Sequence, residues 1–186
     1  NVNAGLDTLL NCVQNNIALE ATSTTIGATF AWSNGANTAS TNISSATTYT
    51  VTATDPNNGC TASDAVIVSQ NTTAPNIDAG LDQELSCINA TATLLGSSST
   101  PTVIYSWSGP GNIINGNTAS ATVNQTGTYT LLATDAMNGC TASDIANVTK
   151  NVNAPTADAG LDQILNCTKL SATLTASSSS SGVSFL

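Results

Sequence analysis

GTYTLLATDAMNGCTASDIANVT, residues 127–149, is the stretch that decides the fold, because it has the pattern of two β-strands joined by a tight turn. Residues 127–134 alternate between polar and apolar side chains, which is the period of a half-buried strand. Asn138-Gly139 is a strong signal for a hairpin turn. In such strands threonine occupies the solvent-exposed face, and Val, Ile or Leu occupy the face that packs against the core. The stretch therefore predicts two antiparallel strands of an all-β protein.

The residues before this hairpin predict further short strands. They lie at 92–95, 103–107, 113–114 and 121–123, after a first, broken strand within 76–87. Turn-forming runs at 97–101 and 108–111 separate them. No segment has the 3.6-residue apolar period of a helix. Seven or so short strands with turns every eight to twelve residues are typical of a β-sandwich.

The same pattern occurs more than once in the chain. Asn58-Gly59-Cys60 returns as Asn138-Gly139-Cys140, and a Gly-Leu-Asp motif begins at Gly5, Gly80 and Gly160, with spacings of 75 and 80 residues. A period this long is that of a small domain used in tandem rather than of a solenoid turn. We predict repeat one at 1–73, repeat two at 74–153 and the truncated start of repeat three at 154–186. The chain is thus expected to be a fragment of a longer array.

Composition excludes several classes of function. Charged residues make up 7% of the chain, the net charge is −9, and Lys150 and Lys169 are the only basic residues. Binding to nucleic acid or to an anionic membrane needs Lys and Arg, so neither is expected. No apolar run approaches the ~20 residues of a transmembrane helix, so no membrane insertion is expected in this segment. The chain lacks His, a phosphate-binding loop and a nucleophile motif, and we expect it not to be an enzyme.

The cysteines recur at fixed places, one near the start and one near the end of each repeat. Widely spaced cysteines without His favour disulfides in an oxidising compartment over a zinc site. We predict one disulfide per repeat, Cys12–Cys60 and Cys87–Cys140, with Cys167 paired beyond residue 186. A sandwich trace leaves an alternative open, because Cys87 precedes the second strand at the bottom of its domain and Cys140 follows the last hairpin at the top. In that case Cys12–Cys140 joins neighbouring repeats.

The aromatic residues predict the core. Trp32 and Trp107 occupy matched positions within strands, which favours core packing over sugar stacking. Tyr49 and Tyr129 each begin the long strand after a turn, where the tyrosine corner of Greek-key sandwiches lies.

The acidic residues are the candidate ligands. Asp78, Asp82 and Asp135 are predicted to gather near the linker from the preceding repeat, with Asp7 and Asp55 as their equivalents in repeat one. Hard oxygen ligands at a domain junction suit Ca²⁺, so calcium is the candidate cofactor. The competing interpretation is that these side chains cap turns through Asx hydrogen bonds.

Residues 155–163, the Tyr105-x-Trp107 strand and the order of motifs from Gly127 to Ala142 resemble PKD-like/Ig-like tandem repeats. In particular they are similar to the repeats of Bacteroidota cell-surface adhesins of the gliding-motility type. The resemblance implies Ig-like/PKD-like β-sandwiches in an extracellular, cell-surface-attached fibre or adhesin stalk that supplies length and rigidity. The expected partners are neighbouring copies or adjacent repeats in a filament, and surface glycans. The alternatives are a glycan- or cell-binding adhesin module, or the non-catalytic spacer of a secreted enzyme.

Overall fold

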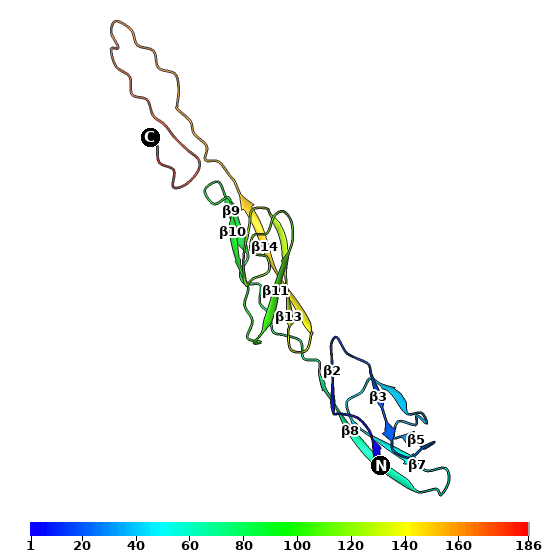
Figure 1. Cartoon of the computed structure of the whole chain (residues 1–186). Coiled ribbons are helices and arrows are strands. Elements are labelled where there is room, and N and C mark those ends of the chain that lie inside the picture. Colours follow the sequence, from blue (N-terminus) through cyan, green and yellow to red (C-terminus); the bar gives the residue numbers. More distant parts are fainter. Residues whose placement is uncertain (186) are drawn as a thin grey trace.

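The computed structural model describes residues 1–185, and its named elements are all β-strands. Repeat one and repeat two follow each other end to end along one line, and the C-terminal residues continue in the same direction (Figure 1). Within the described residues no helix has the length and apolar character needed to cross a membrane. The molecule is therefore a row of β-domains rather than a compact globule.

Repeat one is a two-sheet sandwich. One sheet has the strand order β2-β8-β7-β5, and β3 pairs with β6 in the other. β1 and β4 form a separate, short two-stranded sheet. The strands are β1 (Val2–Asn3), β2 (Thr8–Asn11), β3 (Ile17–Glu20), β4 (Thr22–Ser23), β5 (Thr29–Trp32), β6 (Ser40–Ile43), β7 (Thr48–Thr54) and β8 (Thr61–Asn71).

Repeat two has the same topology. Its larger sheet has the order β11-β13-β14-β9, with β9 parallel to β14, and β10 pairs with β12. The strands are β9 (Gln83–Ser86), β10 (Ala92–Leu95), β11 (Val103–Ser108), β12 (Ser120–Val123), β13 (Gly127–Asp135) and β14 (Thr141–Asn151). A first strand split between two sheets, and a last hairpin next to a tryptophan strand, are the arrangement of Ig-like sandwiches. The all-β tandem sandwich expected from the sequence is the fold of the protein.

Each repeat has its own hydrophobic core, and the two cores share no residue. Trp32 is buried among the residues of the first and Trp107 among those of the second. Leu131, on β13, has no exposed surface, while Tyr105 is half-buried at the edge of the core. Every strand pairs only with strands of its own repeat. Each sandwich therefore buries its apolar faces without help from its neighbour.

Both corner tyrosines bond to the backbone before their strand. The Tyr49 hydroxyl donates to the Ser45 carbonyl at 3.0 Å. The Tyr129 hydroxyl lies within hydrogen-bond distance of the Gln125 and Pro110 carbonyls, at 2.9 and 3.0 Å. Burial raises the pKa of Tyr129. Pro110 lies in the segment by which repeat two exceeds repeat one, so the tyrosine ties that longer loop to the core.

Residues 154–185 contain no named strand. They keep one bridge, Asp158 with Ser177, which corresponds to the bridge between Asp78 and Ser97 in repeat two. Most of their side chains are exposed. With the 80-residue offset, these residues correspond to residues 74–105 of repeat two.

Candidate functional site: the junction between the repeats

The disulfide joins the two repeats, from Cys12 to Cys140, with a Cα–Cα distance of 5.0 Å. The predicted pairs Cys12–Cys60 and Cys87–Cys140 were wrong, and the inter-repeat alternative is the observed bond. Within residues 1–185, Cys60, Cys87 and Cys167 are unbonded and exposed.

Strand geometry explains the correction. Asn11, which precedes Cys12, pairs with Asn71 at the end of β8, whereas Cys60 lies just before the first residue of β8. An 11-residue strand separates them, which corresponds to roughly 35 Å at the rise of a strand. A disulfide needs Cα atoms within about 7 Å. The two cysteines of one repeat therefore lie at opposite ends of their domain.

Asn138 supports the bond from the side of repeat two. Its Nδ2 donates to the Asn71 Oδ1 at 3.0 Å and to the Thr73 carbonyl at 2.9 Å. Its carbonyl accepts the Cys12 N–H at 3.1 Å. Asn138 and Cys140 are almost completely buried, at 2% and 1% exposed. The Asn-Gly-Cys turn of repeat two is thus seated against the end of repeat one by one disulfide and several hydrogen bonds.

Gly139 is needed where the two repeats are closest. Its φ is +69°, which favours glycine, and a Cβ at this position would overlap Val13 Cγ2. In repeat one the equivalent Gly59 has nothing within 4 Å of such a Cβ. The close approach is therefore a property of the occupied junction and not of the turn itself.

Asp135 holds the shape of this turn. Its Oδ1 accepts the Met137 N–H at 2.8 Å, its carbonyl accepts the Gly139 N–H at 2.8 Å, and its own N–H donates to the Cys140 carbonyl at 2.9 Å. Asp135 is 9% exposed. It acts as an Asx cap, which is the competing interpretation of the calcium candidates.

The three calcium candidates are not brought together. The Asp78 Oδ1 accepts the Gly80 N–H, and the Asp82 Oδ1 accepts the Asn147 N–H. Asn147 lies seven residues beyond Cys140 along β14, or roughly 20 Å from the turn of Asp135. The part of the chain that the structure describes holds no group of three or more Cys, Asp or Glu residues suited to a metal ion.

The equivalent aspartates of repeat one also accept backbone N–H groups. The Asp7 Oδ1 accepts the Ile67 N–H at 2.8 Å and the Asp55 Oδ1 accepts the Asn57 N–H at 2.9 Å. In both repeats, the carboxylates predicted as calcium ligands accept backbone N–H groups.

A further acid ties the first strand to the last. The Asp144 Oδ2 accepts the Ala79 N–H at 2.8 Å, and Asp64 makes the same contact with Ala4 in repeat one. Backbone hydrogen bonds, first from Ala79 and then from Ile145, lower the pKa of Asp144. The carboxylate form thus fixes the register of residues 78–80 against β14.

We expect that chelation with EDTA leaves the melting temperature of the chain unchanged, because the acidic side chains accept protein N–H groups. The measurement is thermal unfolding followed by circular dichroism with EDTA and with added CaCl₂. A lower melting temperature in EDTA, restored by CaCl₂, would revive the calcium hypothesis.

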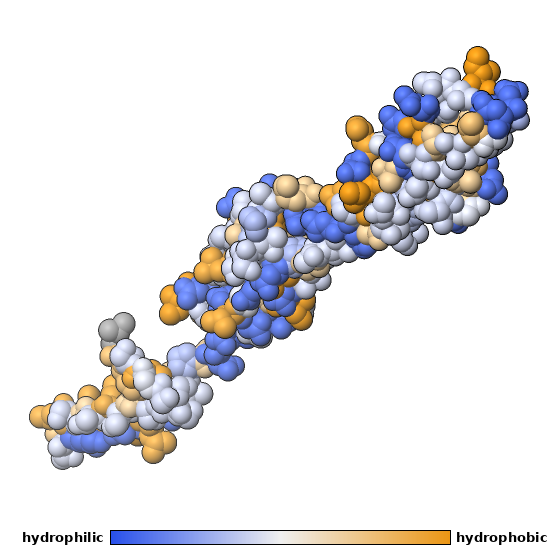
Figure 2. Space-filling view, turned by 90° about the horizontal axis from the view of Figure 1, so that it is seen from below, coloured by the Kyte–Doolittle hydropathy of each residue, from blue (hydrophilic) through white to orange (hydrophobic). Residues whose placement is uncertain are grey.

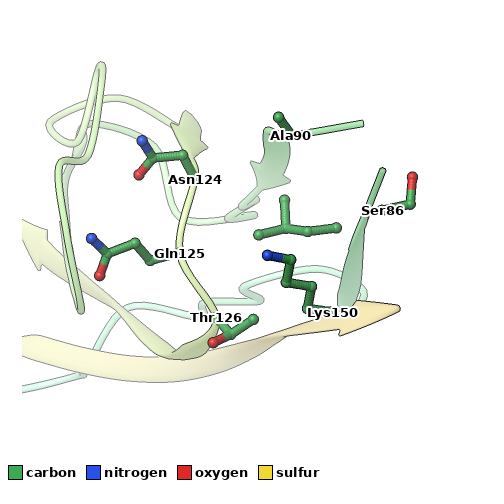
Figure 3. A pocket seen from close by; sticks show the side chains of 7 residues that line it. Ser86, Ala90, Asn124, Gln125, Thr126 and Lys150 are labelled. Atoms are coloured by element: carbon green, nitrogen blue, oxygen red, sulfur yellow. The ribbon is translucent and has the colours of Figure 1, made fainter. Parts of the chain in front are cut away.

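An open hollow of about 520 Å³ lies at the far end of repeat two. Figure 3 shows the Lys150 side chain directed into it from β14, beside the turn that carries Gln125. The remaining lining residues are Leu85, Ser86, Ala90, Asn124 and Thr126. This lining has no carboxylate, thiol or imidazole, so it offers no catalytic pair. The hollow adjoins Ser86, which precedes the unbonded Cys87.

The surface carries apolar side chains at repeating positions. The repeats form separate lobes along one line, and orange side chains occur on each of them (Figure 2). Leu6, Leu81 and Leu161, the leucines of the Gly-Leu-Asp motif, are 90%, 84% and 86% exposed. Every repeat therefore presents one apolar side chain at the same place.

No family model matches the chain, and no curated protein matches it. Similar solved structures include three N-terminal domains of the outer capsid protein Hoc of bacteriophage RB49, at 16% identity and a TM-score of 0.43. Immunoglobulin domains 1–5 of Sidekick-1 (15%, 0.38) and the PKD domain of human KIAA0319 (14%, 0.37) are also similar.

The alignments cover 92%, 82% and 49% of this chain and 65%, 40% and 89% of those chains, respectively. The chain thus spans less than two thirds of the first two. At these identities the similarity concerns architecture and does not bear on ligand or activity.

Sequence reasoning missed the residues that complete the junction. Asn138 was interpreted as part of a hairpin turn, and Asn71 and Thr73 were given no role. The signal that could have found them is the repeat itself, because Asn58 and Asn138 both precede Gly-Cys. An asparagine that precedes Gly-Cys in both repeats predicts that its side chain contacts the neighbouring repeat, in addition to forming the turn.

Proposed function

We propose that this chain is a structural repeat segment of an extracellular fibre or adhesin stalk on a bacterial cell surface, where it supplies length and rigidity. The observation that carries the proposal is the Cys12–Cys140 bond, which crosses the junction rather than a domain core. A disulfide requires an oxidising compartment. A covalent link between neighbours resists bending and extension, which a stalk needs.

The arrangement of the repeats also supports this role. The repeats lie end to end, so each added repeat lengthens the molecule (Figure 1). Neighbouring copies are the proposed partners, with the exposed leucines of each repeat as lateral contact points.

The binding-module alternative places surface glycans on the loops after Trp32 and Trp107. Residues 33–48 and 108–128 contain no aromatic side chain that could stack on a sugar. Both tryptophans are buried. These features favour the stalk over the glycan-binding module.

The test is antibody labelling of intact source cells, examined by electron microscopy before and after digestion of surface proteins by a protease. We expect label on extended structures outside the cell, lost on digestion. Label confined to permeabilised cells would refute the proposal. A glycan array probed with the purified chain separates the alternatives, because selective binding would favour the adhesin module.

A further inference from the structure

We propose that Cys60 and Cys87 are half-sites for two further junctions of the Cys12–Cys140 kind, each taking a flanking repeat of the same chain. Cys60 would bond the Cys12-like loop of a repeat placed before repeat one. Cys87 would bond the Asn-Gly-Cys turn of a repeat placed after repeat two. The inference deepens the stalk proposal and rests on it for the presence of such repeats.

The turn at Cys60 already has the shape of the bonded turn at Cys140. Asp55 N–H donates to the Cys60 carbonyl at 2.9 Å, Gly59 N–H to the Asp55 carbonyl at 2.9 Å, and Cys60 N–H to the Asn58 Oδ1 at 2.8 Å. The same three bonds occur around Cys140, at 2.9, 2.8 and 2.8 Å. The difference is burial, since residues 58–60 are exposed whereas Asn138 and Cys140 are buried.

The loop at Cys87 likewise matches the bonded loop at Cys12. Asn11 N–H donates to the Gln14 carbonyl at 3.0 Å. The Asn11 Oδ1 accepts the N–H groups of Val13 and Gln14. Around Cys87, Ser86 N–H donates to the Asn89 carbonyl at 2.9 Å. The Ser86 Oγ accepts the N–H groups of Ile88 and Asn89. The loop of Cys167 repeats this arrangement, with Asn166 in the place of Asn11.

The polar partners of the junction recur as well. Asn71, which accepts the amide of Asn138, is paired with Asn11 at the end of β8. Asn151 is paired with Ser86 at the end of β14 and holds the same position in repeat two. Asn58 is the exposed counterpart of Asn138. Each end of the described pair of repeats thus carries both the cysteine and the amide of a complete junction.

Both half-sites are preformed, so docking costs little ordering of the chain. Bond formation is an oxidation in which two thiols lose two protons and two electrons. A disulfide oxidant accepts them: oxidised glutathione is reduced to two glutathione thiols, and a thiol-disulfide oxidoreductase to its dithiol form. The new bond joins the two sulfur atoms, and no other group of the chain is consumed.

The test for Cys87 uses a chain in which a second copy of residues 74–153 replaces residues 154–186. This is a reasonable unit because repeat two has its own core. The chain is oxidised in a glutathione buffer under native conditions, alkylated and mapped without reduction. We expect Cys12 bonded to the first-copy Cys140 and Cys87 bonded to the second-copy Cys140, with Cys60 and the last copy of Cys87 alkylated.

The test for Cys60 places an additional copy of residues 1–73 before the chain. We expect the added copy of Cys12 to bond Cys60 while the Cys12–Cys140 bond stays in place. In either chain, Cys60→Ser or Cys87→Ser should remove only the bond that its residue makes. Circular dichroism of these variants checks that the repeats remain folded.

Three results would overturn the proposal. Cys87 or Cys60 could be found alkylated, and therefore unbonded, although Cys12–Cys140 has formed. The disulfide junction would then be specific to repeats one and two and would not recur. Either could bond within its own repeat. Either could bond a second molecule, seen as multimers on a non-reducing gel, which would mean that the half-sites link separate chains. These results concern thiol pairing in the purified chain, so they are independent of the cell labelling that tests the stalk.

Discussion

Trp107→Ala is expected to lower the free energy of unfolding of repeat two by about 3–5 kcal/mol, as found when a buried Trp or Phe is truncated. Trp107 is 6% exposed and lies in a cluster with Leu131 and Leu94, which are fully buried. Removal of the indole leaves a cavity that the two paired sheets cannot close. The effect should stay within repeat two, because the cores are separate.

The chain offers a reporter for this experiment, since it has two tryptophans. In Trp107→Ala, fluorescence comes from Trp32 and follows repeat one, whereas circular dichroism follows both repeats. We expect urea to unfold part of the circular dichroism signal early while the transition of Trp32 is unchanged. A wild-type-like urea profile would contradict the core role of Trp107.

Conservative variants provide a matched control. The Trp32 Nε1 donates to the Thr38 carbonyl at 3.1 Å, whereas the buried Trp107 Nε1 has no partner among the described residues. Trp32→Phe loses a hydrogen bond, which is worth about 1 kcal/mol. Trp107→Phe removes a donor that is already unpaired, so it should cost less than Trp32→Phe. The difference arises in the Trp-to-Tyr segment, where repeat two has extra residues.

The fold was largely predictable from the sequence because its signals are local. Alternation along residues 127–134, the Asn138-Gly139 turn and the matched register of the repeats each concern residues close in the chain. The strands β10, β11 and β13 accordingly occur where the alternation predicts them. The tyrosine corner was predictable for the same reason, since Tyr129 bonds a carbonyl four residues away.

The junction was not predictable to the same extent, because it depends on which end of a domain each loop occupies. Cys12 and Cys60 are the two cysteines of repeat one, and their place in the same repeat favoured the wrong pair. The parallel pairing of β2 with β8 places Cys12 at the far end instead. The acids show the same limit. Their register predicted a shared role, but only the hydrogen bonds show what each acid does. Asp135 caps its own turn, whereas Asp82 accepts an N–H group of β14.

Loss of the junction disulfide is the second change with a large expected effect. The bond closes a segment with a sequence separation of 128 residues. In the chain-entropy model, a loop of this size contributes about 5 kcal/mol. Cys12→Ser combined with Cys140→Ala should therefore unfold at lower urea concentration than the oxidised wild type. Cys60→Ala combined with Cys87→Ala is the matched control and should unfold like the wild type, since neither thiol is bonded.

The same variant should also loosen the rod. Two covalent connections cross the junction, the chain at residues 73–74 and the disulfide. With two separated attachment points, one repeat can rotate relative to the other only about the line that joins those points. With one attachment point, it can rotate in every direction. Without the bond, the hydrogen bonds of Asn138 with Asn71, with Thr73 and with the backbone N–H of residue 12 remain to hold the repeats in line. Small-angle scattering should then give a broader distribution of distances for the Cys12/Cys140 variant, and an unchanged one for the Cys60/Cys87 variant. If the Cys60/Cys87 variant were instead the one that loses stability and stiffness, the bonds would lie within the repeats, and the junction would owe its geometry to the linker alone.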